Sequence, residues 1–246
     1  LMKITKLVIL FNYKKILLGI VISIVLFVFS FLIDSAIIKT LFNSIGGLIL
    51  LNIIASIVAS YLLYDKSDLY EVNKLNEIVD FNNIENAVLI HASFDPLSLQ
   101  LENNYPKLNL TVCDIYGNRH EHESGIIISK KVFTPNPNEI KINPTQLPFT
   151  DNSQNAILAI TAIHEVLDHH KRVQFFEEAK RVLKKDGIII LSEQFRDTTN
   201  FLFFNIGAFH FLSKKQWIKA ITEADLQIAA NKKITPFANM LLIKKK

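Results

Sequence analysis

The chain has 246 residues, of which 50% are hydrophobic, and its formal net charge at pH 7 is +4. A single cysteine, Cys113, excludes an internal disulfide and a cysteine-rich zinc site, which favours a reducing compartment. Lysines gathered near the two ends suit an anionic membrane surface. The rest of the chain has no basic stripe interleaved with aromatic residues, so we expect no nucleic-acid partner.

Two uncharged apolar runs, residues 16–33 and 41–64, begin the chain. At about 1.5 Å per helical residue, roughly twenty apolar residues cross the hydrocarbon core of a bilayer. The sequence therefore predicts that residues 1–64 form a transmembrane α-helical hairpin, with the lipid bilayer as its partner. Lysines precede the first run and Lys66 follows the second, whereas the connection holds only Lys39. This bias predicts a multi-pass protein of the inner (cytoplasmic) membrane with its soluble domain in the cytoplasm.

Two other interpretations of the apolar runs stay open. The first run could be a cleaved signal peptide, but the second run follows at once and no small-x-small cleavage site separates the two. The pair could also be a buried hairpin of a soluble protein, although neither run has a polar face for water.

The rest of the chain divides into a linker with an amphipathic helix, residues 65–85, and an α/β domain, residues 86–246. Hydrophobic periodicity predicts strands at residues 87–90, 110–113, 140–142, 156–160, 188–191, 228–234 and 240–243. It predicts helices at residues 95–104, with Asp95 as N-cap, at 165–185, ending before Asp186 and Gly187, and after the cap residue Ser213. Short strands that alternate with helices predict a Rossmann-like, doubly wound, mostly parallel sheet.

Two turns of this domain carry a recognisable pattern. Residues 147–153 read LPFTDNS before the fourth predicted strand, and residues 181–187 read RVLKKDG before the fifth. At this spacing the two turns resemble the class I S-adenosylmethionine-dependent methyltransferase family, of the type 11-like kind, over about residues 86–246. The resemblance implies the class I methyltransferase fold and S-adenosylmethionine as the cofactor.

The resemblance also implies a cofactor site beyond the carboxyl ends of the strands. Where the family has a glycine-rich loop after its first strand, this chain has His91, Ser93 and Asp95, its largest departure from the family. Asp114 stands where the family has a carboxylate that accepts hydrogen bonds from the cofactor's ribose, although it could instead begin a turn before Gly117. The residues implied to bind the cofactor are His91, Ala92, Ser93, Asp114, Ile115, Gln146, Leu147 and Thr161.

Candidate catalytic residues follow the fourth and fifth predicted strands. The resemblance places His164 beside cofactor and substrate, where its imidazole could act as a general base on an acceptor hydroxyl or orient the acceptor. His164 and Glu165 could instead simply begin a helix, because a carboxylate is favourable at the positive end of the helix dipole. Glu193, after the fifth strand, is the second candidate catalytic residue.

No metal is expected from the histidine spacing. His169 and His170 lie in a charged helical stretch, which favours solvated side chains. The HEHE segment at residues 120–123 lies in a poorly patterned loop without further ligand spacing.

Residues 201–212 form an aromatic run with three open interpretations: a lid over an apolar substrate, a membrane contact, or a core helix. With the anchor and the resemblance, this run predicts a methyltransferase that acts on a hydrophobic, membrane-associated small molecule or lipid. The alternative is a binding or scaffold protein that keeps the fold without catalytic activity, because the glycines are missing. A nicotinamide-dependent oxidoreductase would need a G-x-G-x-x-G turn, which the sequence lacks.

Overall fold

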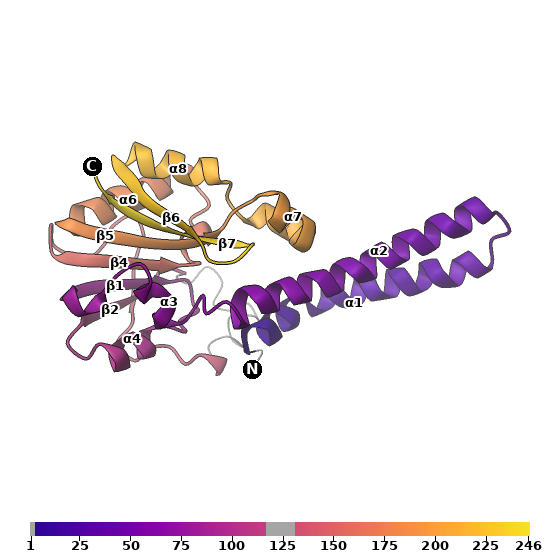
Figure 1. The fold of residues 1–246 in the computed structure, drawn as a ribbon, viewed down its shortest axis with the longest axis horizontal. Coiled ribbons are helices and arrows are strands. Elements are labelled where there is room, and N and C mark those ends of the chain that lie inside the picture. Colours follow the sequence, from indigo (N-terminus) through magenta and orange to yellow (C-terminus); the bar gives the residue numbers. More distant parts are fainter. Residues whose placement is uncertain (1–2, 117–130) are drawn as a thin grey trace.

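The computed structural model describes residues 3–116 and 131–246, and it joins a long helical hairpin to an α/β domain (Figure 1). The hairpin consists of α1 (Lys3–Phe31) and α2 (Ala36–Ser60), and α2 continues into a π-helical turn, η1 (Tyr61–Asp65). Both helices are long and apolar enough to cross a membrane. Only 11% and 17% of their apolar windows are buried inside the protein, whereas the core hairpin of a soluble protein would be mostly covered.

The open end of the hairpin is fixed by Asp65. Its carboxylate accepts hydrogen bonds from the backbone N–H groups of Ile4 and Thr5, at 3.1 and 2.8 Å, and from the Thr5 hydroxyl. The first N–H groups of a helix have no partner within it, and a negative charge is favourable there. Asp65 therefore ties the beginning of α1 to the end of α2, beside the α/β domain (Figure 1).

A seven-stranded sheet forms the centre of the domain, in the order β3-β2-β1-β4-β5-β7-β6. Strand β7 runs antiparallel to β5 and β6, and the pairs among β1 to β5 are parallel. This arrangement confirms the predicted doubly wound sheet, whose order reverses between β1 and β4. The strands are β1 (Asn86–His91), β2 (Asn109–Asp114), β3 (Ile140–Lys141), β4 (Gln154–Ile160), β5 (Leu183–Gln194), β6 (Leu226–Lys233) and β7 (Ala238–Lys245).

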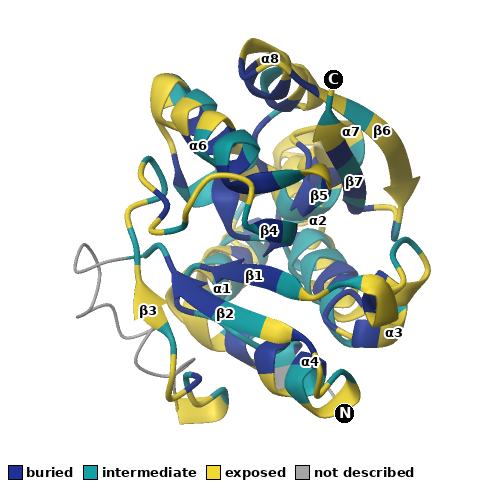
Figure 2. Ribbon diagram, turned by 90° about the vertical axis from the view of Figure 1, so that its left-hand side faces the viewer, coloured by how far each residue is buried: buried dark blue, intermediate teal, exposed yellow. Residues whose placement is uncertain are grey.

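Helices cover both faces of the sheet, as the buried strands between them in Figure 2 show. One core cluster includes Phe176 of α6 and Trp217 of α8, and the other includes Leu63 of η1 and Leu101 of α4. The helices are α3 (Val72–Asn76), α4 (Ser98–Asn104), α6 (His169–Val182), α7 (Thr198–Phe204) and α8 (Lys214–Glu223), with 3-10 turns η2 (Phe81–Asn83), η4 (Ile163–Glu165) and η5 (Asn205–His210).

The prediction of one helix over residues 165–185 is wrong at both ends. The Asp168 side chain accepts a hydrogen bond from the Lys171 N–H at 2.9 Å, so α6 begins at His169. The helix ends at Val182, and β5 runs straight through Asp186 and Gly187, where a helix stop was expected. The pairing of β5 with β4 shifts register at this point, which places the extra residues of the RVLKKDG segment within the strand.

Two capping predictions are confirmed in their chemistry. Ser213 and Gln216 form a reciprocal capping box at the start of α8. The Asp95 carboxylate accepts hydrogen bonds from the N–H groups of Leu97 and Ser98, at 3.0 and 2.9 Å, although α4 begins only at Ser98.

Candidate functional site

The predicted site residues lie at the carboxyl edge of the parallel strands. His91 ends β1 and pairs in register with Asp114, which ends β2. Thr161 follows β4, and its backbone N–H donates to Ser192 of β5 at 2.7 Å. The fold thus gathers residues that are up to about a hundred positions apart along the chain.

Asp114 is enclosed by the loop that replaces the glycines. Its carboxylate accepts hydrogen bonds from the backbone N–H groups of Ser93 and Tyr116, at 3.0 and 2.9 Å, and the Ser93 hydroxyl lies 3.4 Å from its second oxygen. Ser93 takes a φ of +59°, the left-handed region where glycine is favoured. Asp114 is only 1% exposed, and the Ser93 side chain is one of the groups that lie beside its carboxylate.

The same loop holds buried polar atoms that make no hydrogen bond. Among the described residues, Nδ1 of His91 and Oδ2 of Asp95 are buried without a hydrogen-bond partner. His91 Nε2 lies 3.2 Å from a carboxylate oxygen of Glu139, which precedes β3. Buried polar groups in folded proteins are normally hydrogen-bonded, so these atoms fit a loop that receives a polar ligand.

A cavity of about 410 Å³ opens beside the end of β2. Of the predicted cofactor residues, Ile115 lines it, together with Asn143 and Glu165. An apolar side chain and an amide suit the face and the edge of a purine. The lining residues are Ile115, Tyr116, Asn143, Pro144, Thr145, Glu165, Val166, Leu167, Asp168 and Lys171.

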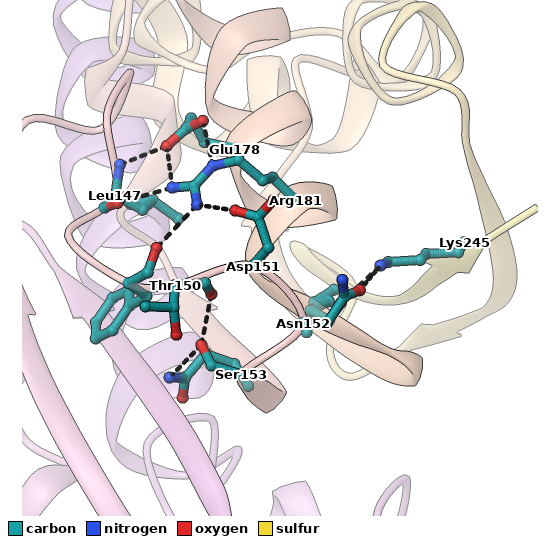
Figure 3. Close-up of polar contacts among 11 residues, drawn as sticks. Leu147, Thr150, Asp151, Asn152, Ser153, Glu178, Arg181 and Lys245 are labelled. Atoms are coloured by element: carbon teal, nitrogen blue, oxygen red, sulfur yellow. Dashed lines mark hydrogen bonds and ion pairs between the residues drawn. The ribbon is translucent and has the colours of Figure 1, made fainter.

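The two motif turns hold each other in place (Figure 3). The Arg181 guanidinium donates to the carbonyl oxygens of Leu147 and Phe149, at 3.0 and 2.9 Å, and to the Asp151 carboxylate at 2.6 Å. Glu178 binds Arg181 and also accepts the Leu147 N–H at 2.8 Å. The Leu147 side chain is buried in the core, and Leu147 is not among the residues that line the cavity.

The linker supplies a residue that sequence reasoning missed. The Tyr70 hydroxyl lies 2.5 Å from Oγ1 of Thr161, and its ring contacts Tyr64 of η1 and Phe94 of the loop after β1. Burial, together with nearby Tyr64, raises the pKa of Tyr70 well above its usual range, so the phenol stays neutral. No periodicity in residues 65–85 points to this contact, because it depends on how the linker folds back over the sheet.

His164 and Glu193, the two candidate catalytic residues, form a pair in which Glu193 is buried and His164 is partly buried. His164 Nδ1 lies 2.8 Å from Oε2 of Glu193, whose Oε1 accepts the backbone N–H groups of Ile163 and His164. The second ring nitrogen, Nε2, lies 3.5 Å from the carboxylate of Glu165. Burial lowers the pKa of His164, but Glu193 and Glu165 together raise it to about 10. The imidazole therefore carries a proton at neutral pH, which suits orientation of an acceptor better than the predicted general-base role.

Other predicted residues have different surroundings. Ala92 and Gln146 are not among the residues that line the cavity. His169 bonds the exposed carboxylate of Glu223 at 2.7 Å, in keeping with a solvated helix face. The HEHE segment at residues 120–123 lies outside the described residues.

A family model and solved structures of known proteins are similar to the α/β domain. Residues 100–191 match the family model of a methyltransferase domain. A S-adenosylmethionine-dependent methyltransferase from Aquifex aeolicus has a TM-score of 0.55 and 12% identity, over 73% of this chain and 92% of that one. The α/β domain has the class I methyltransferase fold. Among curated proteins, none matches the sequence.

Two larger proteins share this fold. The pyocyanin biosynthetic protein PhzM has a TM-score of 0.54 and 10% identity, over 78% of this chain and 59% of its own. The O-methyltransferase NcsB1, solved with S-adenosyl-L-homocysteine and 1,4-dihydroxy-2-naphthoic acid, has a TM-score of 0.51 and 15% identity, over the same shares. Both are longer proteins, of which this chain spans somewhat more than half.

Proposed function

We propose that this protein is a membrane-anchored, S-adenosylmethionine-dependent methyltransferase whose acceptor is a hydrophobic molecule held at the membrane surface. The observation that carries the proposal is that α7, at the carboxyl edge of the methyltransferase sheet, lies directly against the apolar hairpin. A membrane around the hairpin would therefore lie at the same end of the domain as the proposed cofactor site.

Polar contacts fasten α7 to α2. The Asn52 amide donates to the carbonyl oxygen of Leu202 at 3.3 Å, and the Ser56 hydroxyl donates to that of Phe203. Asn205, which follows α7, donates to the side-chain oxygen of Asn52. These contacts begin thirteen residues before Asp65, about 20 Å along the helix from its end.

The hairpin indicates where the membrane surface would lie. Gly19 of α1 packs so closely on Ile53 of α2 that an added Cβ would lie 2.9 Å from the Ile53 Cδ1 atom. Lys15, one turn before Gly19, is therefore level with the stretch around Asn52 and Ser56. A lysine marks the edge of the hydrocarbon core, and the apolar run that follows, residues 16–33, is about 27 Å long against a core of about 30 Å.

The aromatic run, residues 201–212, has some side chains that pack inward on the domain and others that face outward. Phe203 and Phe204 pack on Phe237, with ring centroids 5.2 and 5.6 Å apart, and so belong to the domain core. The outward side chains are apolar and lie beside the proposed membrane surface. They are Phe201, Leu202, Ile206 and Phe209, which are 47%, 67%, 81% and 60% exposed.

S-adenosylmethionine, when bound, supplies an activated methyl group. In this domain Ile115 and Asn143 would hold its adenine in the cavity, and Asp114 would hold its ribose once Ser93 has moved aside. His164, fixed by Glu193, would position the acceptor.

The test is calorimetric titration of the detergent-purified protein with S-adenosylmethionine. Asp114→Ala should abolish binding, and Ser93→Gly should strengthen it, because glycine accepts the left-handed backbone and opens the space beside Asp114. Labelled cofactor added to native membranes, followed by lipid extraction, then identifies the acceptor. Absence of binding to both the wild type and Ser93→Gly at millimolar ligand would contradict the enzyme proposal.

A second candidate is favoured by the enclosed position of Asp114: a binding or scaffold protein that keeps the fold without methyl transfer. It predicts that the wild type binds no cofactor while the double variant His91→Gly, Ser93→Gly gains binding. Cofactor binding by the wild type excludes this candidate.

A further inference from the structure

We propose that His164, Glu165 and His210 form a site for a divalent transition metal of the zinc class. The three residues come from two segments, since His164 and Glu165 lie in η4 after β4 and His210 ends η5. One atom from each lies within 4.8 Å of the others. The proposal goes beyond methyl transfer, because metal binding can be measured whether or not the domain transfers methyl groups.

The spacing suits metal ligands. Nε2 of His164 and Nε2 of His210 each lie 3.5 Å from Oε1 of Glu165. Zinc bonds of about 2.0–2.2 Å at tetrahedral angles place two ligand atoms roughly 3.4 Å apart. Two of the three ligand pairs are therefore close to the spacing of a zinc site, and the third, between His164 and His210, lies within 4.8 Å. Closing that third distance would require a movement of the His210 side chain, which is 49% exposed.

The buried carboxylate of Glu193 holds the His164 ring in the orientation that a metal ligand needs. Because Nδ1 of His164 faces Glu193 at 2.8 Å, the opposite ring nitrogen is the one directed toward Glu165 and His210. Metal-bound histidines usually donate their other ring N–H to a carboxylate in this way, which fixes the tautomer and strengthens the ligand.

The charge of the cluster also favours a cation, whose binding would displace one ring proton of His164 because a metal binds neutral imidazole. Glu193 and Glu165 place two carboxylates around His164, one of them 2% exposed. Two histidines and one carboxylate leave a fourth position open, the donor set of catalytic rather than closed structural zinc sites. Glu165 also lines the cavity described above, so the open position lies next to the proposed cofactor cavity. A bound metal would further tie η5, and hence α7, to the sheet.

Metal binding is tested on the full chain in detergent, first stripped with a chelator. Titration with Zn²⁺ by calorimetry, and with Co²⁺ by visible absorption, should show one equivalent bound, with the spectrum of a four-coordinate ion. His210→Ala and Glu165→Gln should each weaken Zn²⁺ binding by at least about tenfold, and Glu193→Gln by about 10–100-fold. His169→Ala is the matched control, since His169 also faces a carboxylate but lies outside the cluster.

Circular dichroism of each variant verifies the fold, and His210 is exposed enough for its variant to fold normally. The proposal is overturned if the wild type binds no stoichiometric Zn²⁺, or if His210→Ala and Glu165→Gln bind as tightly as His169→Ala. These outcomes do not depend on S-adenosylmethionine, so failure of the metal site and failure of the methyltransferase proposal are separate results.

Discussion

Replacement of Glu193 by glutamine is expected to remove a pH-dependent part of the protein's stability. The Glu193 side chain is 2% exposed and contacts His164 through both oxygens, one at the ring and one at the backbone N–H. Glutamine keeps the shape and one acceptor oxygen but removes the charge. The His164 ring then retains only the carboxylate of Glu165, at 3.5 Å, to favour its protonated form.

The direction and the size of this pH-dependent stabilisation follow from the pKa of His164. Its folded value of about 10 lies above the ordinary value of 6.5, so the stabilisation is present in full below pH 6.5 and is lost as the pH rises toward 10. At 1.36 kcal/mol per pH unit this amounts to at most about 5 kcal/mol. Removal of one nearby opposite charge should lower the pKa of His164 by roughly 1–3.

The assay is urea unfolding of the metal-free full chain in detergent, followed between pH 6 and pH 10, the range in which the stabilisation from protonated His164 should be lost. Fluorescence of Trp217, the single tryptophan, reports on the domain because that side chain is fully buried. The wild type should lose stability across this range, and Glu193→Gln should show a much smaller slope. Glu223→Gln is the control, because it alters an exposed His–Glu pair and should leave the slope unchanged. An equal pH slope in Glu193→Gln and wild type would refute the reasoning.

Three further substitutions test contacts that build the fold. Arg181→Ala should destabilise the domain by about 2–4 kcal/mol in urea unfolding, because it leaves the carbonyl oxygens of Leu147 and Phe149 without their donor; a loss under 1 kcal/mol would contradict this. Asp65→Ala should lower the free energy of unfolding by about 1–3 kcal/mol through loss of the cap of helix α1, which thermal unfolding would show as a lower midpoint. An unchanged midpoint would contradict the capping role of Asp65. Tyr70→Phe should cost about 1 kcal/mol through its lost hydroxyl contact, and unchanged stability would show that this contact is weak.

Strand positions were predictable because buried parallel strands are short apolar runs between turn residues, as at residues 87–90 and 156–160. The start of helix α6 was not predictable, because both Glu165 and Asp168 can begin a helix. Only the backbone geometry shows that Asp168 is the cap. Gly187 suggested a helix end, yet the change of register beside β4 accommodates it within β5.

The site was predictable in place and less so in detail. Asp114 was predictable because it stands at the end of an apolar strand, which is visible in the local sequence. Its contact with Ser93 required knowledge of a left-handed backbone that a serine rarely adopts. The meeting of Glu165 with His210 joins residues 45 positions apart through η5, and no spacing rule anticipates it.

The membrane surface proposed at α7 leads to a direct measurement of depth. The four outward side chains of the aromatic run are each about half exposed or more, and full burial of one such side chain contributes roughly 1.5–3 kcal/mol. If lipid covers them, contact with the bilayer gains several kcal/mol and holds the carboxyl edge of the sheet at the headgroups. If water covers them, the hairpin alone determines attachment and the acceptor need not come from the membrane.

A spin label at residue 206 separates these cases. Ile206→Cys in the full chain, reconstituted in nanodiscs, should be accessible to oxygen dissolved in lipid and protected from a water-soluble nickel reagent. Ile218→Cys on α8 is the matched control, since Ile218 is an exposed isoleucine of the same domain and should show the opposite pattern. The native Cys113 is buried and should remain unlabelled. Nickel accessibility at residue 206 equal to that at residue 218 would place α7 in water, and the proposal of a membrane-held acceptor would then lose its structural basis.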